Sequence, residues 1–168
     1  MPPVTVRQAR TEDAEDIARV LAAVAEEGLV ATEPPVDIES RAGQFREAIQ
    51  GDGPGALWVL ESDGEIVGNA GLLETQVPGV LSLGMAILPA ARGRGGGRAL
   101  LDAALEHARL AGAHKVELEV WPDNARAIAF YAAGGFELEG LRRDHYRRRD
   151  GTLRSTLLMA RRLTQEER

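Results

Sequence analysis

The chain has 168 residues, of which 44% are hydrophobic and 27% charged, and it contains no cysteine. This composition excludes wholesale disorder, and the length predicts a single domain over residues 1–168. The absence of cysteine excludes disulfides, cysteine nucleophiles and thiolate metal sites. Because no apolar run approaches the roughly 20 residues of a membrane span, and the start lacks an apolar signal core, we expect a cytoplasmic protein without a membrane partner.

The net charge of -6 is divided unevenly along the chain. Up to Ala91 the sequence holds 5 basic and 15 acidic residues, and from Arg92 onward it holds 15 basic and 11 acidic residues. This division fits a site for one cationic and one anionic ligand, and it equally fits an ordinary solvated surface. The overall acidic balance disfavours general nucleic-acid binding, so we expect no nucleic-acid partner.

The first half of the chain predicts a strand, two helices and three further strands, punctuated by glycine and proline turns. A hydroxyl cap at Thr11 is expected to start the first helix, which Gly28 ends. Residues 29–36 contain Thr-Glu-Pro-Pro and predict a loop. The strands are expected at 4–8, 56–61, 66–73 and 80–88, and the second helix at 37–50.

The second half alternates between helices and strands. Helices are expected at 98–110 and from Asp123 or Asn124 to 133, and strands at 115–120, 136–141 and 153–161. An Arg-rich hairpin with Asp-Gly in its turn joins the last two strands. The predicted order is βααβββαβαββ, which is a mixed α/β arrangement.

A glycine-rich turn precedes the helix at 98–110 and reads Arg-Gly-Arg-Gly-Gly-Gly-Arg over 92–98. Glycines let the backbone approach a ligand, and the N–H groups of the following helix attract an anion such as a phosphate. Arg92, Arg94 and Arg98 add positive charge. The turn lacks the Gly-Lys-Ser/Thr of a P-loop and the last glycine of a dinucleotide fingerprint, which disfavours both nucleotide sites. A turn without any ligand and an RGG-type RNA segment are the alternatives.

A second pattern follows the strand at 115–120. Asn124, Ala127 and Tyr131 have the spacing i, i+3 and i+7, so they lie along one face of a helix. An amide, a small residue and a phenol in line can run beside an elongated ligand, and the phenol can donate a proton. The alternative is that Asn124 only caps the helix and Tyr131 is an amphipathic surface residue.

Together these two segments resemble the GNAT superfamily of acetyl-CoA-dependent N-acetyltransferases. The family's Arg/Gln-x-x-Gly-x-Gly/Ala signature is matched at 92–97, and its Asn-x-x-Ala-x-x-x-Tyr-x-x-x-Gly-Phe pattern is matched at 124–136. The order of elements matches as well, so the resemblance covers nearly the whole chain. It implies a mixed α/β (α+β) fold with four helices and a mostly antiparallel sheet of six to seven strands, in which the fourth and fifth strands splay apart.

The resemblance also implies roles for individual residues. Acetyl-CoA would pair with the fourth strand at Met85, Ala86 and Ile87, would be held through the amides of Arg92, Gly93, Arg94, Gly95, Gly96, Gly97 and Arg98, and would contact Asn124, Ala127 and Tyr131. Tyr131 would be the general acid that protonates the departing CoA thiolate. Glu119 is similar in position to the base of the ribosomal-protein alanine N-acetyltransferase branch; the alternative is an exposed strand glutamate.

The implied reaction is direct attack of a primary amine on the thioester of acetyl-CoA in a ternary complex, and a base or water chain must take the amine proton. Glu33 and Tyr146 are expected contacts of the amine acceptor, with a charged helix cap and hairpin packing as their alternatives. The acceptor is a small molecule, an amino-acid-like compound or a peptide amine; a narrow cleft would favour the first and an open groove the last.

The sequence also gives expectations for metal binding, oligomeric state and alternative functions. The three histidines show no metal-ligand spacing, so no metal is expected. The family's frequent dimers make a homodimer an open expectation. A non-catalytic acyl-CoA-binding regulatory module is the alternative function, and RNA binding through the Arg-rich hairpin is a third.

Overall fold

The computed structural model describes residues 2–163 and confirms the predicted order of elements. The strands are β1 (Val4–Gln8), β2 (Ala56–Ser62), β3 (Glu65–Glu74), β4 (Val80–Ile87), β5 (Lys115–Val120), β6 (Glu137–Arg147) and β7 (Leu153–Arg162). The helices are α1 (Ala14–Ala25), α2 (Ile38–Gln50), α3 (Gly96–Leu110) and α4 (Ala125–Ala133). Within residues 2–163, no helix is long and apolar enough to cross a bilayer.

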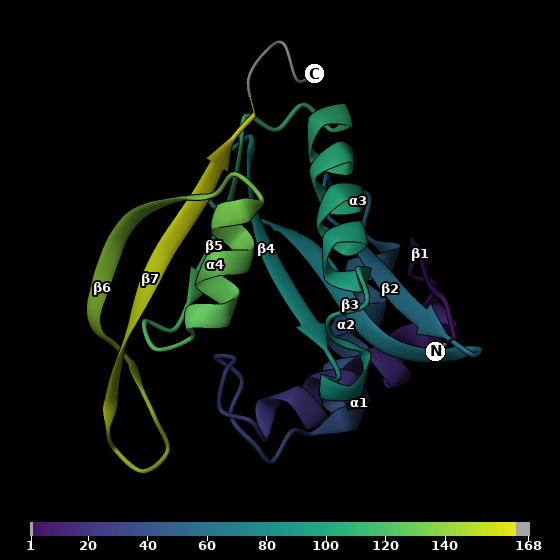
Figure 1. Cartoon of the computed structure of the whole chain (residues 1–168), viewed down its shortest axis with the longest axis horizontal. Helices are drawn as coiled ribbons and strands as arrows, with labels where there is room; N and C mark the ends of the chain where they lie inside the picture. Colours follow the sequence, from purple (N-terminus) through teal and green to yellow (C-terminus); the bar gives the residue numbers. More distant parts are fainter. Residues whose placement is uncertain (1, 164–168) are drawn as a thin grey trace.

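The strands form one seven-stranded sheet in the order β1-β2-β3-β4-β5-β7-β6. Helices cover both faces, with α3 and α4 in front and α1 and α2 behind in Figure 1. Strand β2 shows how both faces become apolar: Trp58 and Leu60 belong to the core cluster under α3, whereas Leu57 and Val59 pack toward α1 and α2. Alternating side chains of a strand point to opposite faces, so a nearly continuous apolar run suits a strand covered on both sides.

The parallel pair β4 and β5 separates partway along its length. Its pairing runs only from Val80 opposite Lys115 to Ser82 opposite Glu117, while β4 stays paired with β3 as far as Ile87. From Leu83 onward, one edge of β4 therefore has no neighbour among the described strands. The predicted splay is confirmed, and it leaves backbone hydrogen-bonding groups available along this edge of β4.

The start of the first helix differs from the prediction. A 3-10 turn over Thr11–Asp13 precedes α1. The start of this turn is capped by the carboxylate of Asp13, which accepts a backbone N–H, and not by the hydroxyl of Thr11. Asp13 accepts the N–H of Arg10 at 2.7 Å and two bonds from the Arg7 guanidinium at 2.7 and 2.9 Å. A carboxylate held by a bidentate arginine accepts a hydrogen bond more strongly than a neutral hydroxyl does, which explains why Asp13 and not Thr11 caps the turn.

Replacing Asp13 by Asn is expected to lower the free energy of unfolding by about 2 kcal/mol at neutral pH, because a buried charge-assisted network is broken. The hydrogen bond from Arg7 lowers the pKa of Asp13 below its ordinary value. Its contribution is thus complete above that ordinary value and disappears as the pH falls through the lowered pKa. Denaturant titrations should show that the difference in unfolding free energy between wild type and variant becomes smaller in acid. Asp16→Asn, at an exposed position of α1, is the control, and a pH-independent gap would contradict the account.

Candidate active site

The glycine-rich turn lies where β4 ends and α3 begins. Gly93 and Gly95 have φ angles of 73° and 83°, and Gly95 is the residue that precedes the helix. The first helical bond runs from the N–H of Ala99 to the carbonyl of Gly95. The N–H groups of residues 96–98 therefore have no acceptor within the helix, and no side chain in residues 2–163 caps this end. This arrangement is suited to bind an anion.

Side-chain atoms leave the turn open on one side and closed on the other. A Cβ placed on Gly93 or Gly95 would meet no heavy atom of residues 2–163 within 4 Å. A Cβ on Gly96 would come within 2.4 Å of Leu60, so this glycine lets α3 pack against β2. The helix consequently starts at Gly96, two residues earlier than predicted. Glycine thus serves two purposes here, exposing the backbone of the turn and seating the helix on the sheet.

The arginine side chains of the turn each contact other groups of the protein. Arg92 donates to the carbonyl of Ile87 at 2.9 Å and forms two bonds to the carboxylate of Glu27, whose pKa it lowers. The guanidinium of Arg94 donates to the carbonyl of Pro2 and to Ser62 Oγ. Arg98 pairs with Asp102 one turn along α3. The anion-binding capacity of the turn thus resides mainly in its backbone N–H groups.

Helix α4 begins at the second predicted pattern. Asn124, and not Asp123, is the cap, since its Oδ1 accepts the N–H of Ala127 at 3.2 Å. Ala127 and Tyr131 both pack against the main core. Phe130 lies within 3.4 Å of a Cβ placed on Gly97, which links α4 to the first turn of α3. The two motifs identified in the sequence are therefore neighbours in the fold.

Tyr131 is held in an aromatic cluster on α4. Its ring centroid lies 5.2 Å from that of Phe130 and 5.7 Å from that of Phe136, both in edge-to-face contact. Burial raises the pKa of Tyr131 to about 12. No hydrogen bond of its hydroxyl to another residue in 2–163 is found. A phenol with this pKa stays protonated at neutral pH and is a proton donor.

Glu119 lies on the face of β5 that is turned away from α3, because its neighbours Leu118 and Val120 point into the core under α3. Its carboxylate is 2.6 Å from Arg142 Nη1 and 2.5 Å from Tyr146 Oη, both on β6. Burial and this hydrogen bond raise the pKa of Tyr146 to about 12. The structure thus brings two sequence-predicted residues, Glu119 and Tyr146, into direct contact.

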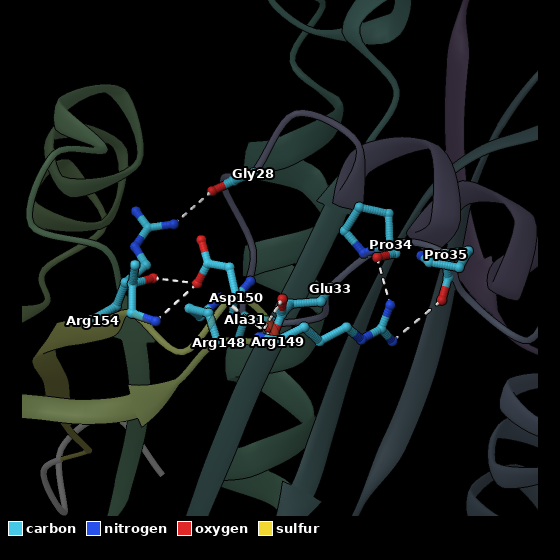
Figure 2. A network of polar contacts seen from close by, with 10 residues as sticks. Gly28, Ala31, Glu33, Pro34, Pro35, Arg148, Arg149, Asp150 and Arg154 are labelled. Atoms are coloured by element: carbon cyan, nitrogen blue, oxygen red, sulfur yellow. Dashed lines mark hydrogen bonds and ion pairs between the residues drawn. The ribbon is translucent and has the colours of Figure 1, made fainter.

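Glu33, the other predicted substrate contact, is bound by the β6–β7 hairpin. Its carboxylate accepts the N–H of Arg149 at 3.2 Å and lies 3.5 Å from Arg148 Nε. Figure 2 shows side chains of the hairpin reaching carbonyls of the loop between α1 and α2. The contacts, which we call the loop–hairpin bridge, are Arg148 to Ala31, Arg149 to Pro34 and Pro35, and Arg154 to Gly28.

Trp121, directly after β5, lies on the same side of the site, and no motif in the sequence identified it. It is buried, with the guanidinium carbon of Arg154 4.1 Å and that of Arg148 5.4 Å from its ring centroid. The ring of Tyr146 meets it edge-on at 5.5 Å. The Arg-rich composition of the hairpin was visible in the sequence, whereas its partners were not, since they lie far away in the chain.

Within residues 2–163, no three His, Asp or Glu side chains are grouped closely enough to hold a metal ion.

Comparison with known proteins gives concordant matches. A family model described as acetyltransferase (GNAT) family matches residues 21–136. An uncharacterized N-acetyltransferase of Escherichia coli K12, YjgM, is 34% identical over 79% of this chain and 81% of its own length. A mycothiol acetyltransferase of Beutenbergia cavernae is 40% identical over 49% of this chain, a match that spans only 29% of that protein.

A solved structure gives a match over a longer stretch. The ribosomal-protein-alanine N-acetyltransferase from Brucella melitensis superposes with a TM-score of 0.83 at 27% identity, over 95% of this chain and 99% of that one. The superposition therefore covers nearly the whole of both chains.

Proposed function

Because the chain belongs to the acetyltransferase (GNAT) family, we propose that it transfers an acetyl group from acetyl-CoA to a primary amine by direct attack in a ternary complex. The observation that carries the proposal is the glycine turn at 92–98. It presents unpaired helix N–H groups beside an edge of β4 that has no partner among the described strands. An elongated ligand with a phosphate group and an amide-containing arm has matching groups along this path.

The residues present fit acetyl-CoA at each point along this path. We assign the pantetheine arm to the backbone of Met85, Ala86 and Ile87, on the edge of β4 that lies beyond the pairing with β5. The pyrophosphate is assigned to the N–H groups of the turn, where the open space at Gly93 and Gly95 admits it. Asn124, Ala127 and Tyr131 on α4 are assigned to the pantetheine and the thioester. Acetyl-CoA supplies the activated acetyl group.

Tyr131 is proposed as the general acid. When the thioester carbon is attacked, the C–S bond breaks and the sulfur leaves as a thiolate, which needs a proton. A pKa of about 12 keeps the hydroxyl of Tyr131 protonated below that pH, and the aromatic contacts hold its ring in place. The proton passes from the phenol oxygen to the sulfur, and solvent restores it.

Glu119 is proposed as the base on the acceptor side. An ammonium ion has no lone pair and cannot attack, so one N–H bond must break before the nitrogen attacks. The carboxylate of Glu119 takes this proton, directly or through a water. Its position on the face opposite Tyr131 separates proton removal from proton donation, which suits an acceptor and a cofactor that enter from different sides.

The acceptor is proposed to be a small primary amine rather than a protein segment. The hairpin and the loop between α1 and α2 lie side by side in Figure 1, and the loop–hairpin bridge joins them beside Trp121. An extended peptide lying between them would have to break these bonds. The named relatives include enzymes of both kinds, since one is named for mycothiol and the other for a ribosomal-protein alanine.

We expect CoA release assays to give a higher kcat/KM for free amino acids and diamines than for a peptide that begins with alanine. Arg149→Ala removes the bonds to the carbonyls of Pro34 and Pro35 and should improve use of the peptide relative to the small amines. Arg147→Ala, at an exposed position of β6, is the matched control for loss of one charge. Preferential acetylation of the peptide by wild type would reverse our assignment of the acceptor class.

A further inference from the structure

The carboxylate of Glu119 has a cation on one oxygen and a phenol on the other. Arg142 Nη1 lies 2.6 Å from Oε1, and Tyr146 Oη donates to Oε2 at 2.5 Å. A carboxylate that serves as base must accept an N–H of the acceptor amine on one of these oxygens. One of the two β6 side chains must therefore share or give up its position when the acceptor binds.

The local fold of β6 brings both side chains to the same carboxylate. Strand β7 lies between β5 and β6, so each side chain must reach across a whole strand. Between Arg142 and Tyr146, β6 carries three residues where the facing stretch of β7 carries one. Asp144, in the middle of this bulge, has a φ of 50° and donates its N–H to Ser155 Oγ at 3.0 Å. A bulge of this kind redirects side chains beside a site.

The two contacts differ in how firmly they are held. The Arg142 side chain is 42% exposed, and an ion pair with so exposed a partner contributes little to stability because water solvates the guanidinium. The Tyr146 ring, by contrast, is half-buried and packs edge-on against the buried ring of Trp121. Arg142 is therefore the partner that leaves Glu119 more easily, and Tyr146 is the one that stays.

We infer that Arg142 occupies on Glu119 the position that the ammonium group of the acceptor takes, and so acts as a built-in competitor for the acceptor. A guanidinium and an ammonium are both cations that donate N–H groups to a carboxylate. Once the ammonium has replaced Arg142, its N–H bond breaks, an O–H bond forms at Oε1, and the electron pair stays on nitrogen for attack. The inference rests on the proposed role of Glu119 in the acceptor site.

Removal of this competitor should strengthen binding of the acceptor. For Arg142→Gln we expect the KM for the amine to fall about two- to fivefold, in line with the small worth of exposed ion pairs, while kcat changes less than KM. Arg142→Lys keeps a cation beside Glu119 and should stay close to wild type. Arg143→Gln removes the same charge one residue away, from a side chain with no polar partner in residues 2–163, and is the control.

The test is steady-state kinetics of the full chain with two probes, L-2,4-diaminobutyrate and an alanine-initiated hexapeptide, at fixed saturating acetyl-CoA. A lower KM in Arg142→Gln alone, for either probe, supports the inference. An unchanged or raised KM overturns it, because Arg142 would then be neutral or would help to bind the acceptor. Failure of every protein to acetylate either probe also overturns it, since the freed carboxylate should accept a primary amine.

Melting each protein with and without acetyl-CoA separates a failure of the Arg142 inference from a failure of the proposed function. If acetyl-CoA raises the Tm of all variants equally and the KM values do not differ, only the role of Arg142 fails. If acetyl-CoA leaves the Tm of wild type unchanged, the proposed function fails instead.

Discussion

Tyr131→Phe should lower kcat by a factor of roughly 10² to 10⁴, the usual range for loss of a general acid, while acetyl-CoA affinity stays within about twofold. The substitution removes one oxygen and keeps the ring, so the edge contacts with Phe130 and Phe136 are preserved. The hydroxyl has no partner among residues 2–163, so its loss leaves no unsatisfied group there. Pre-steady-state CoA release and calorimetric titration of acetyl-CoA measure the two quantities separately.

The pH dependence gives a second check on Tyr131. With a pKa of about 12, the phenol remains protonated through pH 7 to 10, so wild type should not lose activity in this range by ionisation of Tyr131. The ligand-free Tm of Tyr131→Phe should stay close to that of wild type. A variant with the wild-type kcat would remove Tyr131 from the mechanism, whatever its effect on stability.

Gly95→Val should abolish detectable binding of acetyl-CoA, an effect of at least about 100-fold in Kd. Gly95 has a φ of 83°, which a β-branched residue adopts only with strain, and its open side is where the pyrophosphate is proposed to lie. The side chain would cover the N–H groups at the start of α3. Calorimetric titration of acetyl-CoA into the folded variant measures the loss.

Strain alone can also weaken a protein, and Gly112→Val controls for it. Gly112 follows the other end of α3 and has a φ of 79°, and a Cβ added there would likewise meet no heavy atom of the described residues within 4 Å. Both variants should lose about 1–3 kcal/mol of stability through the same backbone strain. Only Gly95→Val should lose acetyl-CoA. Equal affinities in the two variants would mean that the pyrophosphate lies elsewhere.

The order of the elements could be predicted because the signals for it are local. Turns at Gly64 and Gly79 adopt the positive φ angles that their sequences indicate, and Asn124 caps α4 through a residue three positions away. Alternation in β5 separates the core-facing Leu118 from the outward Glu119. Each of these features depends on residues within one turn or one strand of each other, which a single sequence displays directly.

The polar contacts of the site could not be predicted, because their partners are distant in the chain. Glu119 meets Arg142 and Tyr146, 23 and 27 residues later, and only the β5-β7-β6 order with its bulge brings them together. Arg94 donates to Ser62 Oγ, 32 residues earlier, and so anchors the turn to the end of β2. Spacing along the chain carries no signal for such contacts.

The first residue of α3 could not be predicted from the sequence for a different reason. Glycine has a low helix propensity, so the sequence favours a helix that begins after Gly97. The contact of Gly96 with Leu60 shows why the helix begins earlier: only glycine lets the first turn of α3 approach β2 this closely. Tertiary packing overrides the local preference, and the same glycines leave the backbone N–H groups uncovered.

Thermal melting with saturating acetyl-CoA, beside ATP and NAD at equal concentration, tests the proposed cofactor site most directly. A ligand at about 100 times its Kd adds roughly 2.7 kcal/mol to the stability of the folded state. For a chain of this size that corresponds to a Tm increase of several degrees. The account predicts this increase with acetyl-CoA and none with ATP or NAD. An unchanged Tm with acetyl-CoA, or equal increases with all three, would contradict it.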